Sequence, residues 1–148
     1  MTTVRSRAFA ALAAFVVMEP ATYASHRWIM HGLGWGWHRS HHEPHPGVLE
    51  ANDLYPVAFA GATIVTMAVA RARPGMDTVM ASAVGVTAYG VAYGFVHDFY
   101  IHQRFGVRPA RWAPLEYLRR AHAHHHDYGG EPYGMLFPVI PRRSLRKG

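Results

Sequence analysis

The chain has 148 residues, half of them hydrophobic, with 12 histidines and no cysteine. This length fits one domain, residues 1–148. Without cysteine, disulfides, zinc fingers and thiolate-ligated iron–sulfur clusters are excluded, so any metal must be bound by imidazole and oxygen. The formal net charge of +6 favours an anionic partner, which means nucleic acid, acidic lipid or an acidic protein, and only the position of the charges distinguishes these.

The first hydrophobic segment, residues 8–18, is interrupted by Glu19 and Pro20 and continues weakly to Ala24. Alone it is short for a membrane span. A signal peptide cleaved near Ala24 is one interpretation. Cleavage there would leave His26 at a frayed terminus, so we favour a helix that turns Glu19 toward protein rather than lipid.

Two further hydrophobic segments cover residues 54–70 and 79–96, and residues 71–75 between them contain Pro and Gly and predict a tight turn. The second of these segments contains Gly85, Gly90 and Gly94 among several alanines. Small residues at such spacing, including Gly90 and Gly94 four apart, are typical of helices that approach closely inside a bilayer. A soluble helical hairpin with a glycine-rich core is the alternative. Two segments of near-membrane length favour spans, so we expect an all-α, multi-pass membrane bundle of about three spans.

The basic residues are unevenly divided between the two sides of such a bundle. Segments 25–53 and 97–148 contain eleven of the 15 Arg and Lys residues. By the positive-inside rule these segments, which also carry the histidines, face the cytoplasm from the cell membrane. A nucleic-acid surface is disfavoured because no known binding module is recognisable. An interfacial aromatic belt is expected at the same boundary, made of Trp28, Trp35, Trp37 and Tyr55.

Two histidine triplets share the spacing i, i+3, i+4. They are His38, His41 and His42, and His122, His125 and His126. On a helix this spacing places all three imidazoles on one face, where neutral rings can converge on a metal. One triplet would be weak evidence, but two make a metal site a strong prediction.

Two histidine pairs, His26 with His31 and His97 with His102, have the spacing i, i+5. Residues five apart lie about 140° from each other on an ideal helix. Either the helix loosens between them, or the two imidazoles bind different metals.

Glycines and prolines indicate how the triplets are placed. Glycines at positions 32, 34 and 36 allow the chain to turn after His31 and bring the first triplet back over it. Pro114 is expected to begin the helix with the second triplet, and Pro44 with Pro46 to end the helix with the first.

Ten repeated histidines exceed the about four to six ligands of one ion and suit two ions held close together in a histidine-rich cytoplasmic cap. His45 and His124 lie outside the repeat. Asp98, Asn52 and Asp53 are candidates to orient a ligand through its other ring nitrogen, although solvation or helix capping explains them equally well. The predicted metal ligands are His26, His31, His38, His41, His42, His97, His102, His122, His125 and His126.

The four motifs HRWIMH, HRSHH, HDFYIH and HAHHH follow the pattern HxxxxH, HxxHH, HDxxxH, HxxHH. In this order they resemble the β-carotene hydroxylases, within the membrane fatty acid hydroxylase and sterol desaturase superfamily. The resemblance extends over nearly the whole chain, through HHEPHPGVLEANDLYPV, HQRF and GGEPYGMLF. The extra His124 in the last motif and the short C-terminus depart from the pattern.

This resemblance implies a membrane-embedded non-heme di-iron monooxygenase. Such an enzyme uses O2 and electrons from reduced ferredoxin to hydroxylate C3 of a β-ionone ring, which converts β-carotene to β-cryptoxanthin and zeaxanthin. Imidazole alone suits zinc, copper and nickel as well as iron. Oxidation of an unactivated carbon requires a redox metal, and this favours iron over zinc.

Other functions remain open at this stage. A sibling di-iron oxygenase acting on fatty acyl chains, sterols or ring C4 would use the same histidines. A soluble two-metal phosphohydrolase is suggested only by the dipeptide His97–Asp98. A membrane protein that binds metal without catalysis is the non-enzymatic alternative. Arg119 and Arg120 are candidates to dock ferredoxin or anionic lipid. Residues 135–140 either dip into the interface or pack on the helices.

Overall fold

The computed structural model describes residues 3–44 and 47–138, and these are helical or irregular, without a strand. The expected all-α fold is confirmed. Short π-helical (η1, η3) and 3-10 (η2) segments adjoin the α-helices. In chain order the elements are α1 Val4–Ala24, η1 Ser25–Leu33, α2 Trp35–His42, η2 Ala51–Asp53, α3 Leu54–Ala72, α4 Asp77–Gly94, η3 Phe95–Ile101 and α5 Ala113–Tyr128.

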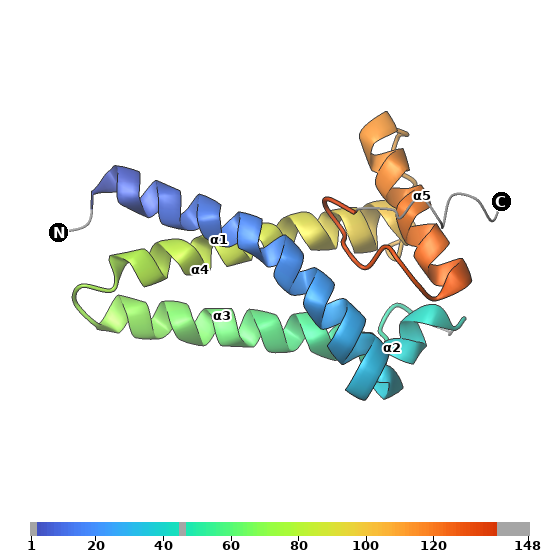
Figure 1. The fold of residues 1–148 in the computed structure, drawn as a ribbon, viewed down its shortest axis with the longest axis horizontal. Helices are drawn as coiled ribbons and strands as arrows, with labels where there is room; N and C mark the ends of the chain where they lie inside the picture. The colour runs from blue at the N-terminus through green and yellow to red at the C-terminus, as the bar shows by residue number, and fades with distance from the viewer. Residues whose placement is uncertain (1–2, 45–46, 139–148) are drawn as a thin grey trace.

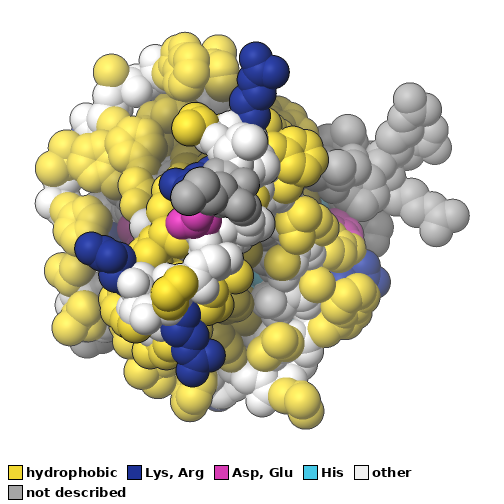
Figure 2. Space-filling view, turned by 90° about the vertical axis from the view of Figure 1, so that its left-hand side faces the viewer, with side chains coloured by type: hydrophobic (Ala, Val, Ile, Leu, Met, Phe, Trp, Pro, Cys, Tyr) yellow, Lys and Arg dark blue, Asp and Glu magenta, His cyan; other side chains and the backbone are white. Residues whose placement is uncertain are grey.

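Three continuous helical stretches are long and apolar enough to cross a membrane. They run over Val4–Leu33, Ala51–Ala72 and Asp77–Ile101, with mean hydropathies of 1.4 to 1.5. Figure 2 shows the end of the molecule that carries the N-terminus, where most visible side chains are hydrophobic and basic ones are scattered among them. An apolar surface of this extent suits contact with lipid rather than water.

The long helices form a bundle in which α4 is central. Helices α3 and α4 lie antiparallel, α1 packs across α4, and α2 and α5 lie together at the end opposite the α3–α4 turn (Figure 1). Helices α1 and α4 approach closely at Gly85, where an added Cβ would lie 2.0 Å from the carbonyl oxygen of Ala11. The expected pair, Gly90 and Gly94, is not that contact, because a Cβ at Gly90 would meet open space and one at Gly94 only Asp98 of the same helical stretch.

Glu19 faces protein, as predicted. Its carboxylate accepts a hydrogen bond of 2.6 Å from the Tyr89 hydroxyl of α4. It also accepts the backbone N–H groups of Met135, Leu136 and Phe137, at 2.8, 3.1 and 3.0 Å. The carboxylate therefore ties the chain after α5 to the first span. Within residues 135–138, Met135 is buried, whereas Phe137 is 67% exposed. Residues 139 and 140 lie outside the described ranges.

Candidate metal centre

Each histidine pair lies at a π-helical segment that continues a membrane-length helix, and His102 is the residue directly after η3. The N–H of Gly34 donates to the carbonyl of Ile29 at 2.7 Å, and the N–H of His102 donates to that of His97 at 2.9 Å. These five-residue hydrogen bonds define a widened turn that aligns residues five apart. His26 and His31 therefore share a face, as do His97 and His102. The sequence left two possibilities, a loosened helix or two imidazoles that bind different metals. The structure shows the loosened helix.

The chain reverses at glycine after the first pair, as expected. Gly32 has non-helical dihedrals, φ −108° and ψ −113°, and α2 begins three residues later. The Tyr55 hydroxyl of α3 donates to the carbonyl of Gly34 at 2.9 Å and holds this turn against the second span. At the other triplet, Pro114 lies in the first turn of α5, also as expected.

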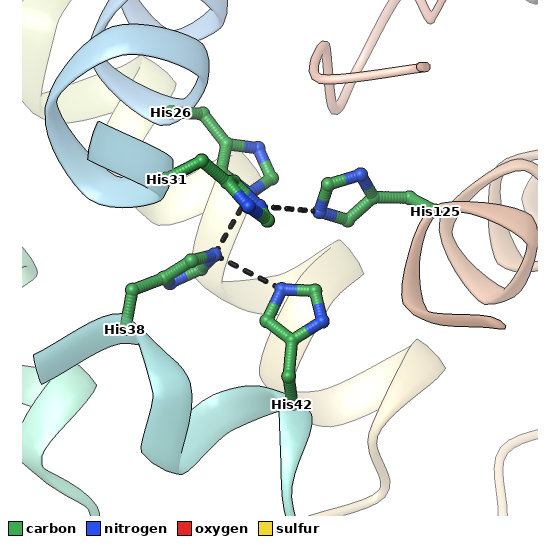
Figure 3. Close-up of side chains that lie close together, drawn as sticks. All are labelled: His26, His31, His38, His42 and His125. Carbon is green, nitrogen blue, oxygen red and sulfur yellow. Dashed lines mark hydrogen bonds between the residues drawn. The ribbon is translucent and has the colours of Figure 1, made fainter. Parts of the chain in front are cut away.

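One cluster contains five histidines from three elements. Figure 3 shows the imidazoles directed toward a common centre, with two from η1, two from α2 and one from α5. The Nε2 atoms of His26 and His38 lie 3.0 Å apart, as do those of His31 and His125. One nitrogen from each ring lies within 4.8 Å of all the others in the first cluster, which consists of His26, His31, His38, His42 and His125.

A second cluster of histidines adjoins the first. Its mutually close members are His41, His97, His102 and His122. His126 adjoins this set, since its Nε2 lies 2.9 Å from that of His122 and its ring stacks on His42 of the first cluster at 4.2 Å. The second cluster, with His126 included, therefore contains the other five repeated histidines.

The sequence left open which histidine joins which site, and the structure divides each triplet between the two clusters. From the first triplet His38 and His42 join the first cluster, but His41 joins the second. On a helix, the i+3 and i+4 positions lie on opposite sides of residue i, about 100° from each other. A triplet that lies between the two clusters therefore directs its imidazoles toward both of them. The second triplet is divided in the same way and sends His125 to the first cluster.

Several histidines donate through Nδ1 and so leave Nε2 free to face the cluster. His38 Nδ1 lies 2.7 Å from Asn52 Oδ1, and His97 Nδ1 lies 3.0 Å from Asp98 Oδ1. Two of the three predicted orienting residues thus contact a histidine. The third, Asp53, instead pairs with Arg104 at 2.8 Å and caps η2 by accepting from the backbone N–H of Glu50 at 3.0 Å.

Three orienting groups were missed by the sequence analysis. His41 Nδ1 lies 2.9 Å from Glu50 Oε1, and the backbone carbonyls of Tyr133 and Gly130 accept from His26 and His125 at 2.9 and 2.5 Å. A backbone carbonyl carries no sequence signal. Glu50 lies in an irregular segment with no periodicity, and its closeness to Asn52 was the one available signal.

Burial lowers the pKa of five histidines outside the spans, to about 3 for His38 and His42, about 4 for His125, and about 2 for His102 and His126. These five rings are therefore neutral at physiological pH, and neutral imidazole is the form that binds metal. Ten imidazoles in two adjacent groups fit a pair of transition-metal ions, although imidazole by itself does not select iron.

A polar cavity of about 410 Å³ opens beside both clusters. His42 of the first cluster lines it together with His41, His102 and His126 of the second, and Glu50 and Arg104 form part of its wall. Charged walls suit water and protons better than a hydrocarbon ring.

His124 lies apart from both groups and packs on Tyr128 at 4.6 Å between ring centroids. His45 lies outside the described residues.

The fold and the site together define a helical protein of membrane type with a histidine-rich candidate metal centre. Residues 11–142 match the model of the fatty acid hydroxylase family, and the chain belongs to that family. No solved structure gave a significant match.

Named relatives refine this placement. The chain is 45% identical over 135 residues to a beta-carotene hydroxylase of Paracoccus sp. (strain PC1), covering 87% of this chain and 80% of the relative. It is 44% identical over 134 residues to a beta-carotene hydroxylase of Pantoea ananas, covering 88% and 74%. Beta-carotene 3-hydroxylase 1 of Arabidopsis thaliana is 36% identical over 130 residues, which cover 83% of this chain and 41% of the plant protein.

Proposed function

We propose that this protein is a β-carotene 3-hydroxylase, a membrane monooxygenase that binds two iron ions and uses O2 and reduced ferredoxin. The observation that carries the proposal is the assembly of all ten repeated histidines into two adjoining clusters. Two relatives named beta-carotene hydroxylase and a plant relative named beta-carotene 3-hydroxylase, each matched over most of this chain, support the substrate. The enzyme would lie in the cell membrane with its histidines toward the cytoplasm, because the basic residues accompany them.

The ten histidines would hold the ions, five in each cluster. When bound, two iron ions supply the redox chemistry that activates O2 for hydroxylation of an unactivated carbon. The chain supplies neutral Nε2 donors and fixes their direction through Nδ1 hydrogen bonds to Asn52, Glu50 and Asp98. Burial of the rings among helices restricts the entry of water to the centre.

A carotenoid dissolves in the bilayer, so its ring would enter laterally between the helices and meet the centre at the membrane surface. Ferredoxin, a soluble donor, would approach from the cytoplasmic side. The charged cavity beside His41 and His42 would serve water and protons rather than the carotenoid ring.

Expression in cells that accumulate β-carotene, followed by pigment analysis and iron determination on the purified protein, tests the proposal. We expect β-cryptoxanthin and zeaxanthin, together with two iron ions per chain. Pigment oxidised at C4, or hydroxylated fatty acids or sterols with unchanged carotene, would identify a sibling oxygenase instead. Bound metal without consumption of O2 would indicate a metal-binding protein without this activity.

A further inference from the structure

The two histidine clusters differ in the charge of the groups that accept their outer hydrogen bonds. In the first cluster, His38 donates to the amide oxygen of Asn52, while His26 and His125 donate to backbone carbonyls. All three acceptors are neutral. In the second cluster, His41 and His97 face the carboxylates of Glu50 and Asp98, at 2.9 and 3.0 Å.

One arginine joins the two carboxylates of the second cluster. Arg104 lies two residues after His102, and its NH1 is 3.0 Å from Asp98 Oδ1 and 3.5 Å from Glu50 Oε1. Its NH2 is 2.8 Å from Asp53 Oδ2. Arg104 also donates to the backbone carbonyl of Val48. A single guanidinium therefore connects the end of η3 with the segment before α3.

This network is partly shielded from solvent, with Asp53 and Asp98 23% and 26% exposed. The side chain of Arg104 is 15% exposed, and that of Glu50 is only 4% exposed. Ion pairs in such a place are screened much less by salt than pairs on an open surface. The multi-pronged contact also uses the planar fork of arginine, which lysine cannot reproduce.

The charge of the network acts on one cluster. Three carboxylates (Glu50, Asp53 and Asp98) and one guanidinium leave a formal excess of two negative charges beside His41 and His97. A carboxylate that accepts from a bound imidazole makes that ligand more basic and fixes its orientation. Neutral oxygens around the first cluster orient their rings without adding charge.

We infer that the two ion sites are electrostatically unequal, with Glu50, Asp98 and Arg104 strengthening the second, and that Arg104 is the positioning residue for that site alone. The inference rests on the two-ion centre proposed above. Arg104 holds both carboxylates against their histidines and limits the repulsion between them. The second cluster therefore binds its ion more tightly and favours a more highly charged ion.

The test loads the detergent-solubilised full chain with ⁵⁷Fe(II) under anaerobic conditions and measures iron per chain and the Mössbauer spectrum. For the unaltered protein we expect two ions and two quadrupole doublets of equal area. In Arg104→Gln the two carboxylates lose the guanidinium that holds them against their histidines, and this loss of position should outweigh the added negative charge. The affinity for one of the two ions should fall by about 10- to 100-fold, and one doublet should shift or disappear. Arg104→Lys, which keeps the charge without the fork, should restore the signal in part.

Arg7→Gln is the matched control, because Arg7 pairs with Asp77 at 2.7 Å at the end of the bundle far from the histidines. It should retain two ions and both doublets. If Arg104→Gln does not fold, Asp98→Asn and Glu50→Gln replace it, since each keeps an oxygen for the histidine and removes one charge. Each should shift one doublet and leave the other unchanged.

The outcomes separate this inference from the proposed function. An unaltered protein that binds fewer than two ions contradicts the two-ion centre itself. Two ions in the unaltered protein, with the same affinities and the same spectrum in all the network variants, leave that centre standing and overturn the inequality. Equal shifts of both doublets would also overturn it, because the network would then act on both clusters.

Discussion

At the scale of single residues, the division of each triplet between two centres has a direct consequence. His41 belongs to the second cluster and His125 to the first, although each adjoins a histidine of the other cluster in the sequence. In the proposed two-ion centre, neighbours in the chain would therefore serve different ions. A single substitution at His41 or at His125 should therefore affect one ion, whereas substitution of a whole motif would affect both.

We predict that His41→Ala and His125→Ala each remove one ion and lower product formation by about 100-fold or more, because orienting groups outside the ligands alone are worth about 10- to 100-fold. Iron analysis and pigment analysis on the same preparations measure both effects. His124→Ala is the control, since His124 packs on Tyr128 away from the clusters. Full activity and two ions in either variant would contradict the ligand assignment.

Glu19 makes a second prediction at this scale. Its carboxylate accepts hydrogen bonds from the segment 135–137, which follows the carbonyls that orient His26 and His125. Hydrogen bonds to a charged group contribute about 1.5–3 kcal/mol. Glu19→Gln loses the charge and can no longer accept through both carboxylate oxygens.

Glu19→Gln should therefore lower the free energy of unfolding by about 2 kcal/mol and speed amide hydrogen exchange in residues 130–138. Thermal unfolding in detergent and exchange mass spectrometry measure the two effects. Glu43→Gln removes the charge of a side chain that is 60% exposed and should change neither. Unaltered exchange in residues 130–138 would show that Glu19 does not hold this segment.

At the scale of the elements, the two π-helical segments explain why pairs spaced i, i+5 occur beside triplets spaced i, i+3, i+4. A widened turn aligns the pairs, and an ordinary α-helix presents the triplets. The first pair and first triplet then meet because the chain reverses between η1 and α2. In this reversal Gly34 lies against Tyr55 of α3.

We predict that Gly34→Ala disturbs the reversal, because its Cβ would lie 1.7 Å from the hydroxyl oxygen of Tyr55. Overpacking of this kind costs about 1–3 kcal/mol, and displacement of α2 should also weaken iron binding in the first cluster. Tyr55→Phe removes the clashing atom, so the double variant should recover part of the loss. Unfolding and iron content measure the effect.

Gly36→Ala is the matched control for this prediction, since a Cβ there meets nothing within 4 Å. It should be neutral or slightly stabilising, because alanine is favoured over glycine inside a helix. A Gly34→Ala protein as stable as Gly36→Ala would show that the close contact with Tyr55 is not required.

At the scale of the whole molecule, the distribution of charge predicts how a soluble electron donor would dock. Arg119 is engaged with Glu116 at 2.8 Å, whereas Arg120 is exposed on α5 near the histidines. Of the two arginines expected to contact a partner, Arg120 is thus the one whose position suits an acidic ferredoxin.

Arg120→Glu should lower ferredoxin-supported turnover several-fold at low ionic strength, and the difference should shrink as salt screens the charges. Steady-state turnover over a series of salt concentrations measures it. Arg71→Glu, the same change at the opposite end of the bundle, should have no effect. Turnover that does not depend on ionic strength would contradict docking by charge and leave anionic lipid as the partner of this surface.

Much of the fold followed from local patterns in the sequence. Long apolar segments predicted three helices, proline marked the start of α5, and the duplicated spacing identified all ten histidines that the structure brings together. Glu19 was expected to face protein because a carboxylate in an apolar segment is costly to expose to lipid. Each of these inferences depends on residues within one segment.

Contacts between segments were beyond such patterns. The sequence did not show that Gly85 rather than Gly90 meets another backbone, that Glu50 orients His41, or that Asp53 pairs with Arg104. The sequence also did not decide whether the helix loosens at the i, i+5 pairs or whether the two imidazoles of each pair bind different metals. Periodicity fixes the direction of a side chain about its own helix, but its partner depends on how distant helices pack.

The sequence by itself thus determined the number of membrane-length helices and the set of candidate ligands, because hydrophobicity predicts the first and histidine spacing the second. The tertiary structure alone decided which histidine joins which cluster. Helix α2 lies between two centres, so a single face of three imidazoles is shared by both. That position is set by the reversal at Gly34 and by packing against α3, which no local spacing encodes.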